Sequence, residues 1–456
     1  MINNKLFQQF IFWGVWLVIP LTCELIIGII SAIICFINGL KGKQRVQALE
    51  YSPRVSILVP IYNSENTLSK CLESILYQTY PLDSMEVILI DNGSNDNSYD
   101  IFTKFQSENP KLKLWWINSL QGKAKALNKG IFCSTGKYII NIDSDGWLDK
   151  NAVQNVIVKF EQNTDVACMT GVILTEPALI SKTSKIFLKI IQICEYFEYM
   201  ESFLIGRNFY SEFNSMYTLA GAFSCFRREI LLKTSMYNFS TVGEDTHMTF
   251  QIRTIFKQNI SLCDDAFFYV DPIESLNKLY TQRQRWQRGQ IEVASLYKDY
   301  HIGNFAKFIK NPFMRILISD HTLVFPRLIW FFGMIYLYYI NYPLSLLISS
   351  NILIYVAYTF NSFVYLNVAK LFLRNQPEAK EYVSHNFFIC LILPIYRFLV
   401  YWMRLAGIIN STTQSANWKT QNFTQEIKIA KNRIKEIMGL FYPAWKYISD
   451  ILNNEK

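Results

Sequence analysis

The residues best placed for chemistry are two carboxylates that follow an apolar run. Asp143, Ser144 and Asp145 come directly after residues 138–142, Tyr-Ile-Ile-Asn-Ile. Two carboxylates at this spacing can share one divalent cation, Mg²⁺ or Mn²⁺, through hard oxygen ligands. Such a cation would neutralise a diphosphate leaving group. The alternative is a solvated acidic turn, because a lone pair of this kind is common.

Two more motifs supply a candidate base and a candidate cation. Glu244 and Asp245 follow Gly243 and precede a helical pattern, so a carboxylate here could cap the helix or act as a general base. Lys123 begins another helical pattern, where exposed N–H groups and positive charge both attract phosphate. A solvated helix face is the alternative for Lys123.

A fourth motif, residues 282–289 (Gln-Arg-Gln-Arg-Trp-Gln-Arg-Gly), surrounds one tryptophan with three arginines. Arginine suits bidentate binding of a diphosphate, and Trp286 suits contact with a sugar ring. Arginines that face solvent are the alternative.

Two polar residues follow earlier apolar runs. Asp91 is placed to hydrogen-bond a nucleotide base or ribose, with an ordinary Asx-Gly turn as the alternative. Tyr62 could stack on a base or be a buried tyrosine.

The elements that must position these residues form an α/β pattern from about residue 52 to 300. Short apolar runs at 55–59, 87–90, 114–117 and 138–142 predict buried strands, and residues 68–76 between the first two recur at helical spacing. Strand, helix and strand in this order predict a mainly parallel sheet of the nucleotide-binding type. Ligands bind such a sheet at the carboxyl ends of its strands.

The composition indicates membrane contact on both sides of this domain. The 456 residues are 51% hydrophobic and 16% aromatic, more apolar than one soluble core requires. Residues 10–37 are long enough to span once, and residues 323–340 and 344–366 predict an antiparallel pair of crossings. Residues 387–409 carry Arg397 and Arg404, so this segment either lies in the interface or lines a polar path. Residues 305–317 predict an interfacial helix.

Charge and cysteine content predict the compartment and exclude some partners. Lys41, Lys43 and Arg45 follow the first apolar stretch and place the next domain in the cytoplasm. The net charge of +9 is spread out and flanks apolar segments, which favours attraction to a lipid bilayer over nucleic-acid binding. Nine scattered cysteines without a C-x-x-C pair suit a reducing compartment.

Taken in order, the motifs resemble those of processive family 2 glycosyltransferases, such as cellulose, hyaluronan and poly-N-acetylglucosamine synthases. The series consists of Tyr62, Asp91, Lys123, Asp143-Ser144-Asp145, Glu244-Asp245 and Gln282-x-x-Arg285-Trp286. Residues 221–227 also look like the acceptor-side loop of that family. Within the group, the chain most resembles glycosyltransferases associated with exosortase systems in Gram-positive bacteria.

The resemblance implies a role for each motif residue. Tyr62 and Asp91 would hold uracil, Lys123 the diphosphate, and Asp143 and Asp145 the nucleotide and metal. Asp245, with Glu244 beside it, would provide the catalytic base. Gln282 and Arg285 would contact the diphosphate, and Trp286 would stack under the acceptor sugar. Asn92 and His247 depart from residues common in relatives, so neither position is assigned a role.

The resemblance also implies an architecture: a GT-A type α/β domain inserted between transmembrane and interfacial helices of a multi-pass plasma-membrane protein. We expect an N-terminal transmembrane segment (1–45), a cytoplasmic glycosyltransferase domain (46–300), an interfacial helix (301–320), a transmembrane and interfacial region (321–410) and a basic tail (411–456). The expected partners are a UDP-sugar donor, a glycan acceptor and accessory membrane subunits of an export system. The alternatives are a non-processive enzyme acting on a lipid-linked acceptor and an inactive glycan-binding or translocating subunit.

Overall fold

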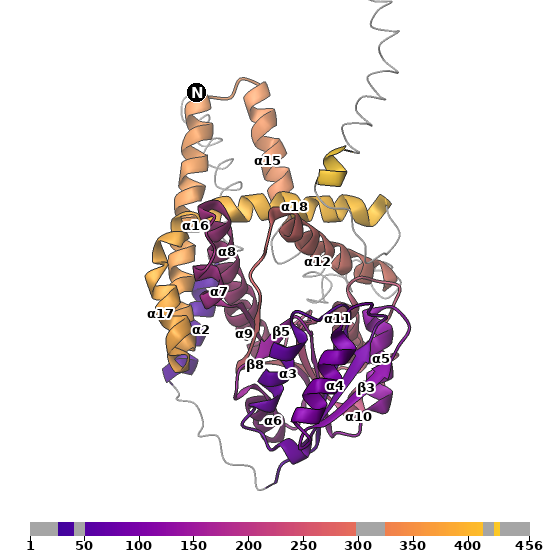
Figure 1. The fold of residues 1–456 in the computed structure, drawn as a ribbon. Coiled ribbons are helices and arrows are strands. Elements are labelled where there is room, and N and C mark those ends of the chain that lie inside the picture. Colours follow the sequence, from indigo (N-terminus) through magenta and orange to yellow (C-terminus); the bar gives the residue numbers. More distant parts are fainter. Residues whose placement is uncertain (1–25, 41–50, 298–323, 414–423, 429–456) are drawn as a thin grey trace, which may run out of the picture.

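The computed structural model describes residues 26–40, 51–297, 324–413 and 424–428 (Figure 1). Its centre is an eight-stranded sheet in the order β3-β2-β1-β4-β7-β6-β8-β5. The strands are β1 (Val55–Ile61), β2 (Met85–Asp91), β3 (Lys113–Asn118), β4 (Tyr138–Ile142), β5 (Gly146–Leu148), β6 (Val166–Thr175), β7 (Phe223–Arg227) and β8 (Asn259–Val270).

The first four strands confirm the predicted parallel half of the sheet. β1 pairs in parallel with β2 and β4, and β2 pairs in parallel with β3. Every residue of β4 is buried, which explains the continuous apolar run that marked this strand in the sequence. The predicted helix between β1 and β2 is α3 (Leu68–Leu76), and its buried residues Leu68, Cys71, Leu72 and Ile75 form one face.

The other half of the sheet is mixed, but four of the seven described strand pairs are parallel, so the sheet as a whole is mostly parallel, as predicted. β7 runs antiparallel to both β4 and β6, and β5 runs antiparallel to β8. Only β6 and β8 pair in parallel in this half. Between β6 and β7 the chain forms a helical excursion and then re-enters the sheet in the opposite direction.

Helices cover the sheet and extend beyond it. Around the sheet lie α4 (Ser98–Glu108), α5 (Lys123–Cys133), α6 (Ala152–Gln162), α7 (Pro177–Ser181), α9 (Arg207–Glu212), α10 (Arg228–Leu231) and α11 (Glu244–Phe250). The excursion between β6 and β7 contains α8 (Ile186–Tyr199), which continues as a π-helical turn η3 (Met200–Gly206).

A second group of helices follows the sheet domain in the sequence. These are α12 (Leu276–Leu296), α15 (Val324–Tyr339), α16 (Leu344–Phe372), α17 (Pro377–His385) and α18 (Leu393–Thr413). The earlier helix α2 (Ile27–Leu40) packs against α16. α18 lies across α15 and α16 and packs on α12, which separates it from the sheet (Figure 1).

Among the described residues, one helix, Leu344–Asn375, is long and apolar enough to cross a membrane. This helix corresponds to the predicted crossing at residues 344–366. The partner predicted at 323–340 corresponds to α15 over its described residues, Val324–Tyr339. Only residues 26–37 of the crossing expected at 10–37 are described. The interfacial helix expected at 301–320 lies outside the described residues. Of the tail, only residues 411–413 and 424–428 are described.

Candidate active site

A pocket of about 690 Å³ lies between the sheet domain and the second group of helices. Ten residues were predicted to form the site, and the pocket brings eight of them together: Lys123, Asp143, Asp145, Glu244, Asp245, Gln282, Arg285 and Trp286. They come from the turn after β4, the starts of α5 and α11, and the first half of α12. Motifs separated by more than a hundred residues therefore face one space.

The other two predicted residues, Tyr62 and Asp91, do not line this pocket. They lie beside each other at the carboxyl ends of β1 and β2, because Ile61 pairs directly with Asp91. The Tyr62 side chain is 47% exposed, so the buried-tyrosine alternative is wrong. One Asp91 carboxylate oxygen accepts a hydrogen bond from the Ser94 backbone N–H at 3.0 Å, so this oxygen holds the turn that follows β2.

Asp143 and Asp145 concentrate negative charge at the end of β4. Asp143 forms an ion pair with the Nζ of Lys123. Asp145 is open to the pocket, but the surrounding protein still removes much of the water from its carboxyl group. This partial desolvation, together with the negative charge of Asp143, raises the pKa of Asp145 to about 6. A cation between the two carboxylates would remove this repulsion.

The chemistry of these donors fits Mg²⁺ or Mn²⁺, which prefer carboxylate, phosphate and water oxygens. Within the described residues there is no group of three or more His, Cys, Asp or Glu that could hold a metal ion. The protein would therefore supply Asp143 and Asp145, and phosphate or water oxygens would complete the coordination. Mg²⁺ is commonly held in this way, by one or two carboxylates together with substrate phosphates.

Glu244 and Asp245 begin helix α11, as the sequence predicted. One oxygen of Asp245, Oδ1, accepts a hydrogen bond from the Thr246 N–H at 2.7 Å and so serves the helix start. Burial raises the pKa of both carboxyl groups, that of Glu244 to about 7. A carboxyl group with a raised pKa is better suited to accept a proton than an ordinary surface aspartate.

Gly221 separates the candidate base from the candidate diphosphate lysine. A Cβ atom at this position would lie 3.4 Å from Asp245 Oδ2 and 3.7 Å from Lys123 Nζ. The missing side chain thus leaves open the space between a carboxylate and an ammonium group. Lys123 also donates a hydrogen bond to the Gly221 carbonyl at 3.4 Å, which ties this loop to the start of α5.

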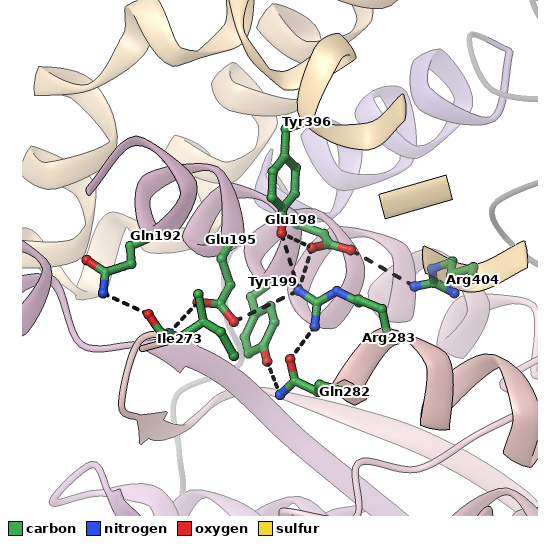
Figure 2. A network of polar contacts seen from close by, with 9 residues as sticks. All are labelled: Gln192, Glu195, Glu198, Tyr199, Ile273, Gln282, Arg283, Tyr396 and Arg404. Atoms are coloured by element: carbon green, nitrogen blue, oxygen red, sulfur yellow. Dashed lines mark hydrogen bonds and ion pairs between the residues drawn. The ribbon is translucent and has the colours of Figure 1, made fainter. Parts of the chain in front are cut away.

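Gln282, Arg285 and Trp286 lie on the side of α12 that faces the pocket. Gln282 donates to the hydroxyl of Tyr199 at 3.1 Å (Figure 2). The Trp286 ring is 6.0 Å from the rings of both Tyr199 and Phe203, measured between centroids. These contacts fix one side of the indole and leave it at the pocket wall.

The alternative that the α12 arginines face solvent is wrong for two of the three. Arg283 and Arg288 are among the largest fully buried side chains in the described structure. Arg283 contacts the Glu198 carboxylate at 2.6 Å and donates to the Gln282 side-chain carbonyl at 2.5 Å (Figure 2). Its guanidinium also lies 4.4 Å from the centre of the Trp286 ring.

Three glutamates that the sequence motifs did not include complete this network. Glu195, Glu198 and Glu201 line the pocket from α8 and η3 and face arginines of α12 and α18. Glu198 lies 4.0 Å from Arg404, and Glu201 pairs with Arg397, so both arginines in the apolar segment 387–409 have acidic partners. Three glutamates at three-residue spacing in an otherwise apolar helix were the signal that could have revealed them.

We expect Arg283→Met to lower the free energy of unfolding by about 3 to 5 kcal/mol, because it leaves Glu198 charged and buried without its closest cation. The matched control is Lys278→Met on the same helix, whose pair with Glu274 is exposed and should cost at most about 1 kcal/mol. Denaturant unfolding in detergent measures both. Equal losses in the two variants would show that the buried pair has no special weight.

Comparison with known proteins supports an assignment. The sequence model described as Glycosyl transferase family 2 matches residues 56–234, which hold the β1-to-β7 part of the sheet with Asp143 and Asp145. The protein is a glycosyltransferase whose matched region is of the family 2 type. The structure of the mannosyltransferase PcManGT from Pyrobaculum calidifontis, in complex with GDP-Man and Mn²⁺, superposes with a TM-score of 0.54 at 16% identity and covers 88% of this chain and 98% of that one. The enzyme therefore has an α/β fold of the GT-A type.

Longer sequence matches relate the enzyme to bacterial synthases. The poly-beta-1,6-N-acetyl-D-glucosamine synthase of Staphylococcus epidermidis is 27% identical over 369 residues, or 78% of this chain and 82% of that protein. The probable glycosyltransferase YdaM of Bacillus subtilis is 25% identical over 350 residues, or 75% and 78% of the two chains. The similarity extends beyond the region matched by the family model.

Proposed function

We propose that the enzyme transfers a sugar from a UDP-sugar to a growing glycan by an inverting single displacement. The observation that carries the proposal is the pocket itself, which unites an acidic pair, a lysine, a buried carboxylate, an arginine and a tryptophan from distant parts of the chain. These are the groups needed to hold a diphosphate, accept a proton and support a sugar ring. The similarity to a polysaccharide synthase supports the same reaction.

In the proposed reaction, Asp245 accepts the proton of an acceptor hydroxyl as the hydroxyl oxygen attacks the anomeric carbon. The bond from that carbon to the diphosphate oxygen breaks, and UDP departs with the electron pair. Lys123 and Arg285 face the negative charge that develops on the leaving group. One displacement inverts the configuration at the anomeric carbon, so no covalent sugar-enzyme intermediate is needed.

Asp143 and Asp145 would hold Mg²⁺ or Mn²⁺, which when bound would neutralise charge on the diphosphate. The other end of the donor would reach the sheet edge, where Tyr62 offers an exposed ring and Asp91 a carboxylate for uracil. Glu244 lies beside the base, and burial together with the negative charge of Asp245 raises the pKa of Glu244. These assignments rest on the resemblance to the family and on the positions of the side chains.

The deciding experiment is to incubate purified enzyme with a panel of UDP-sugars and Mg²⁺ or Mn²⁺ and to measure UDP release. UDP-N-acetylglucosamine is the first donor to test, because one relative is named for that polymer. Release of UDP from one donor, with inverted configuration in the product, supports the proposal. If no UDP-sugar is consumed while GDP-sugars are, the donor assignment is wrong.

Processive elongation is the finer part of the proposal, and Trp286 tests it. Trp286→Ala removes the surface on which the acceptor sugar would stack, without altering the carboxylates or Lys123. We expect glycan elongation to stop while slow hydrolysis of the donor to UDP continues, because water needs no platform. Product length and UDP release are measured together. A Trp286→Ala enzyme with unchanged product length would refute the acceptor role.

The same product analysis separates the alternatives. A non-processive enzyme acting on a lipid-linked acceptor would add one sugar and stop. An inactive glycan-binding or translocating subunit would release no UDP, yet it would have no use for a base, an acidic pair and a diphosphate lysine in one pocket. The association with an exosortase system and with accessory subunits stays a prediction.

We further propose that the enzyme is a multi-pass membrane protein with its sheet domain and basic tail in the cytoplasm. Support comes from the membrane-length helix Leu344–Asn375 and from the lysines and arginines at 41–45. We expect a cysteine engineered into residues 370–380, where α16 ends and α17 begins, or into the tail to resist a membrane-impermeant thiol reagent added to intact cells. Labelling of the tail from outside would mean that residues 387–409 cross the membrane.

A further inference from the structure

Helix α11 carries the proposed base but is too short to set its own orientation. It has seven residues, with Asp245 at its second position, and continues only as the five-residue π-helical turn η4 (Gln251–Ile255). A helix of this length makes few internal hydrogen bonds and depends on packing for its stability. The position of the Asp245 carboxylate therefore depends on what holds the ends of α11.

The loop before α11 touches α12 backbone to backbone. A Cβ atom on Gly289 would lie 2.8 Å from the Cα and 3.0 Å from the nitrogen of Gly243, and a Cβ on Gly243 would lie 2.8 Å from the carbonyl carbon of Gly289. Such distances to backbone atoms are too short for a real side chain. Glycine at both positions is what allows this approach, immediately before Glu244 and Asp245.

A glutamate of α12 holds the same loop by hydrogen bonds. Glu292 accepts from the Val242 N–H at 2.9 Å and from the Thr241 hydroxyl at 3.0 Å. Its other oxygen accepts from Arg288 at 2.7 Å, one helical turn earlier, which fixes the direction of the carboxylate. The Thr241 hydroxyl in turn accepts from the Gly243 N–H at 3.0 Å.

The far part of α11 is held by the residue that ends α12. The Tyr297 hydroxyl lies 2.8 Å from His247 Nε2, and the Tyr297 ring stacks on Phe250 with centroids 3.9 Å apart. The other ring nitrogen of His247 is 3.1 Å from the Gln251 side-chain nitrogen. One nitrogen of His247 thus contacts the end of α12, and the other contacts a side chain one turn further along its own helix. These contacts give a structural role to a position that the motif series left unassigned.

We propose that α12 fixes the base relative to the diphosphate and acceptor residues, and that Gly289, Glu292 and Tyr297 are positioning residues for Asp245. The first half of α12 carries Gln282, Arg285 and Trp286, and its second half makes all three contacts with α11 and the loop before it. One helix thus links the group that accepts the proton to the groups that hold the two substrates. The inference rests on the proposed function, because it assigns the base to Asp245.

Gly289→Ala gives the largest expected effect, because its Cβ would push α11 away from α12. A misplacement of about 1 Å in a catalytic arrangement can lower the rate about 100-fold. We expect kcat for sugar transfer to fall about 10- to 100-fold. The KM for the UDP-sugar selected by the panel, and the dissociation constant of UDP itself, should stay within about twofold of native values, because Lys123, Asp143 and Asp145 keep their places.

Two milder changes keep the test decisive if Gly289→Ala does not fold. Tyr297→Phe retains the ring stack on Phe250 and removes only the hydroxyl that contacts His247. Glu292→Gln retains an oxygen that can accept from Val242, whereas Glu292→Ala retains none. We expect kcat to fall less in Glu292→Gln than in Glu292→Ala, with UDP affinity unchanged in both. In Tyr297→Phe we expect kcat to fall without a change in the KM for the donor.

The matched control is Gly130→Ala in α5, where a Cβ would lie 2.9 Å from the Ile90 side chain and 3.2 Å from that of Leu58. This variant crowds the core without touching α11, so it should lower the unfolding temperature and leave kcat per folded enzyme unchanged. Asp245→Asn is measured beside it. If Asp245→Asn loses activity while Gly289→Ala, Glu292→Ala and Tyr297→Phe all keep native kcat, the positioning inference is overturned alone. If Asp245→Asn keeps native kcat, the base assignment and this inference fall together.

Discussion

Asp245→Asn should reduce sugar transfer by about 10² to 10⁴-fold while leaving UDP affinity near its native value, since a general base typically contributes that much to the rate. Asparagine keeps the size of the side chain and an oxygen that can accept from the Thr246 N–H, so α11 should still begin at the same place. What is lost is the ability to accept a proton from the acceptor hydroxyl. Transfer rate and UDP binding, measured on the same preparation, separate these effects.

The control for this substitution is Asp100→Asn, which also removes an acid from the first turn of a helix but lies outside the pocket. It should leave the transfer rate unchanged. An Asp245→Asn enzyme that transfers sugar normally would remove Asp245 from the mechanism.

The pH profile of the native enzyme gives an independent check on the same carboxylate. A base is active only when deprotonated, so kcat falls as pH drops through its pKa. Burial raises the pKa of Asp245 above the ordinary aspartate value of 3.8, so the acidic limb should lie at a higher pH than that value. The limb should disappear from the residual activity of Asp245→Asn.

Removal of divalent cations should abolish transfer, because Asp143 and Asp145 would otherwise repel the diphosphate that they face. We expect excess chelator to eliminate UDP release and added Mg²⁺ or Mn²⁺ to restore it. Asp145→Asn should weaken metal-dependent UDP binding more than it changes the unfolding temperature. The substitution removes the repulsion between Asp145 and Asp143, so we do not expect it to destabilise the fold.

Asp149→Asn is a suitable comparison, because Asp149 follows β5 close to the site in sequence but does not line the pocket. Its substitution should leave metal dependence unaltered. Full activity of the native enzyme in excess chelator would contradict the metal assignment.

The parallel half of the sheet could be predicted because β1, β2 and β4 are mostly apolar on both faces and are followed by polar turn residues. The residues at 138–142 illustrate this: all five are buried in β4, and Asp143 follows them. The antiparallel entry of β7 could not be predicted in the same way. Its residues are also mostly buried, and an apolar run gives no sign of strand direction.

The residues that meet in the pocket could be proposed from the sequence because each has a side chain whose chemistry recurs in an ordered series. Their supports could not, since the partners lie far apart in sequence. Arg283 and Glu198 are separated by 85 residues, and Tyr396 and Glu198 by 198. Whether an arginine in an apolar helix meets lipid, water or a carboxylate depends on packing that local patterns do not encode.

The ion pair between Lys123 and Asp143 joins a group proposed for the diphosphate to a group proposed for the metal. Lys123 cannot contact the diphosphate fully, and Asp143 cannot coordinate the metal fully, while the two side chains are paired. The ion pair must therefore open when either the nucleotide or the metal binds. The ligand that binds first supplies the free energy needed to break this ion pair. The second ligand then binds to a side chain that is already unpaired. By thermodynamic linkage, the cation and the nucleotide should therefore strengthen each other's binding by the same factor. With the proposed assignments, the enzyme would bind the complete metal-donor complex more tightly than either component alone.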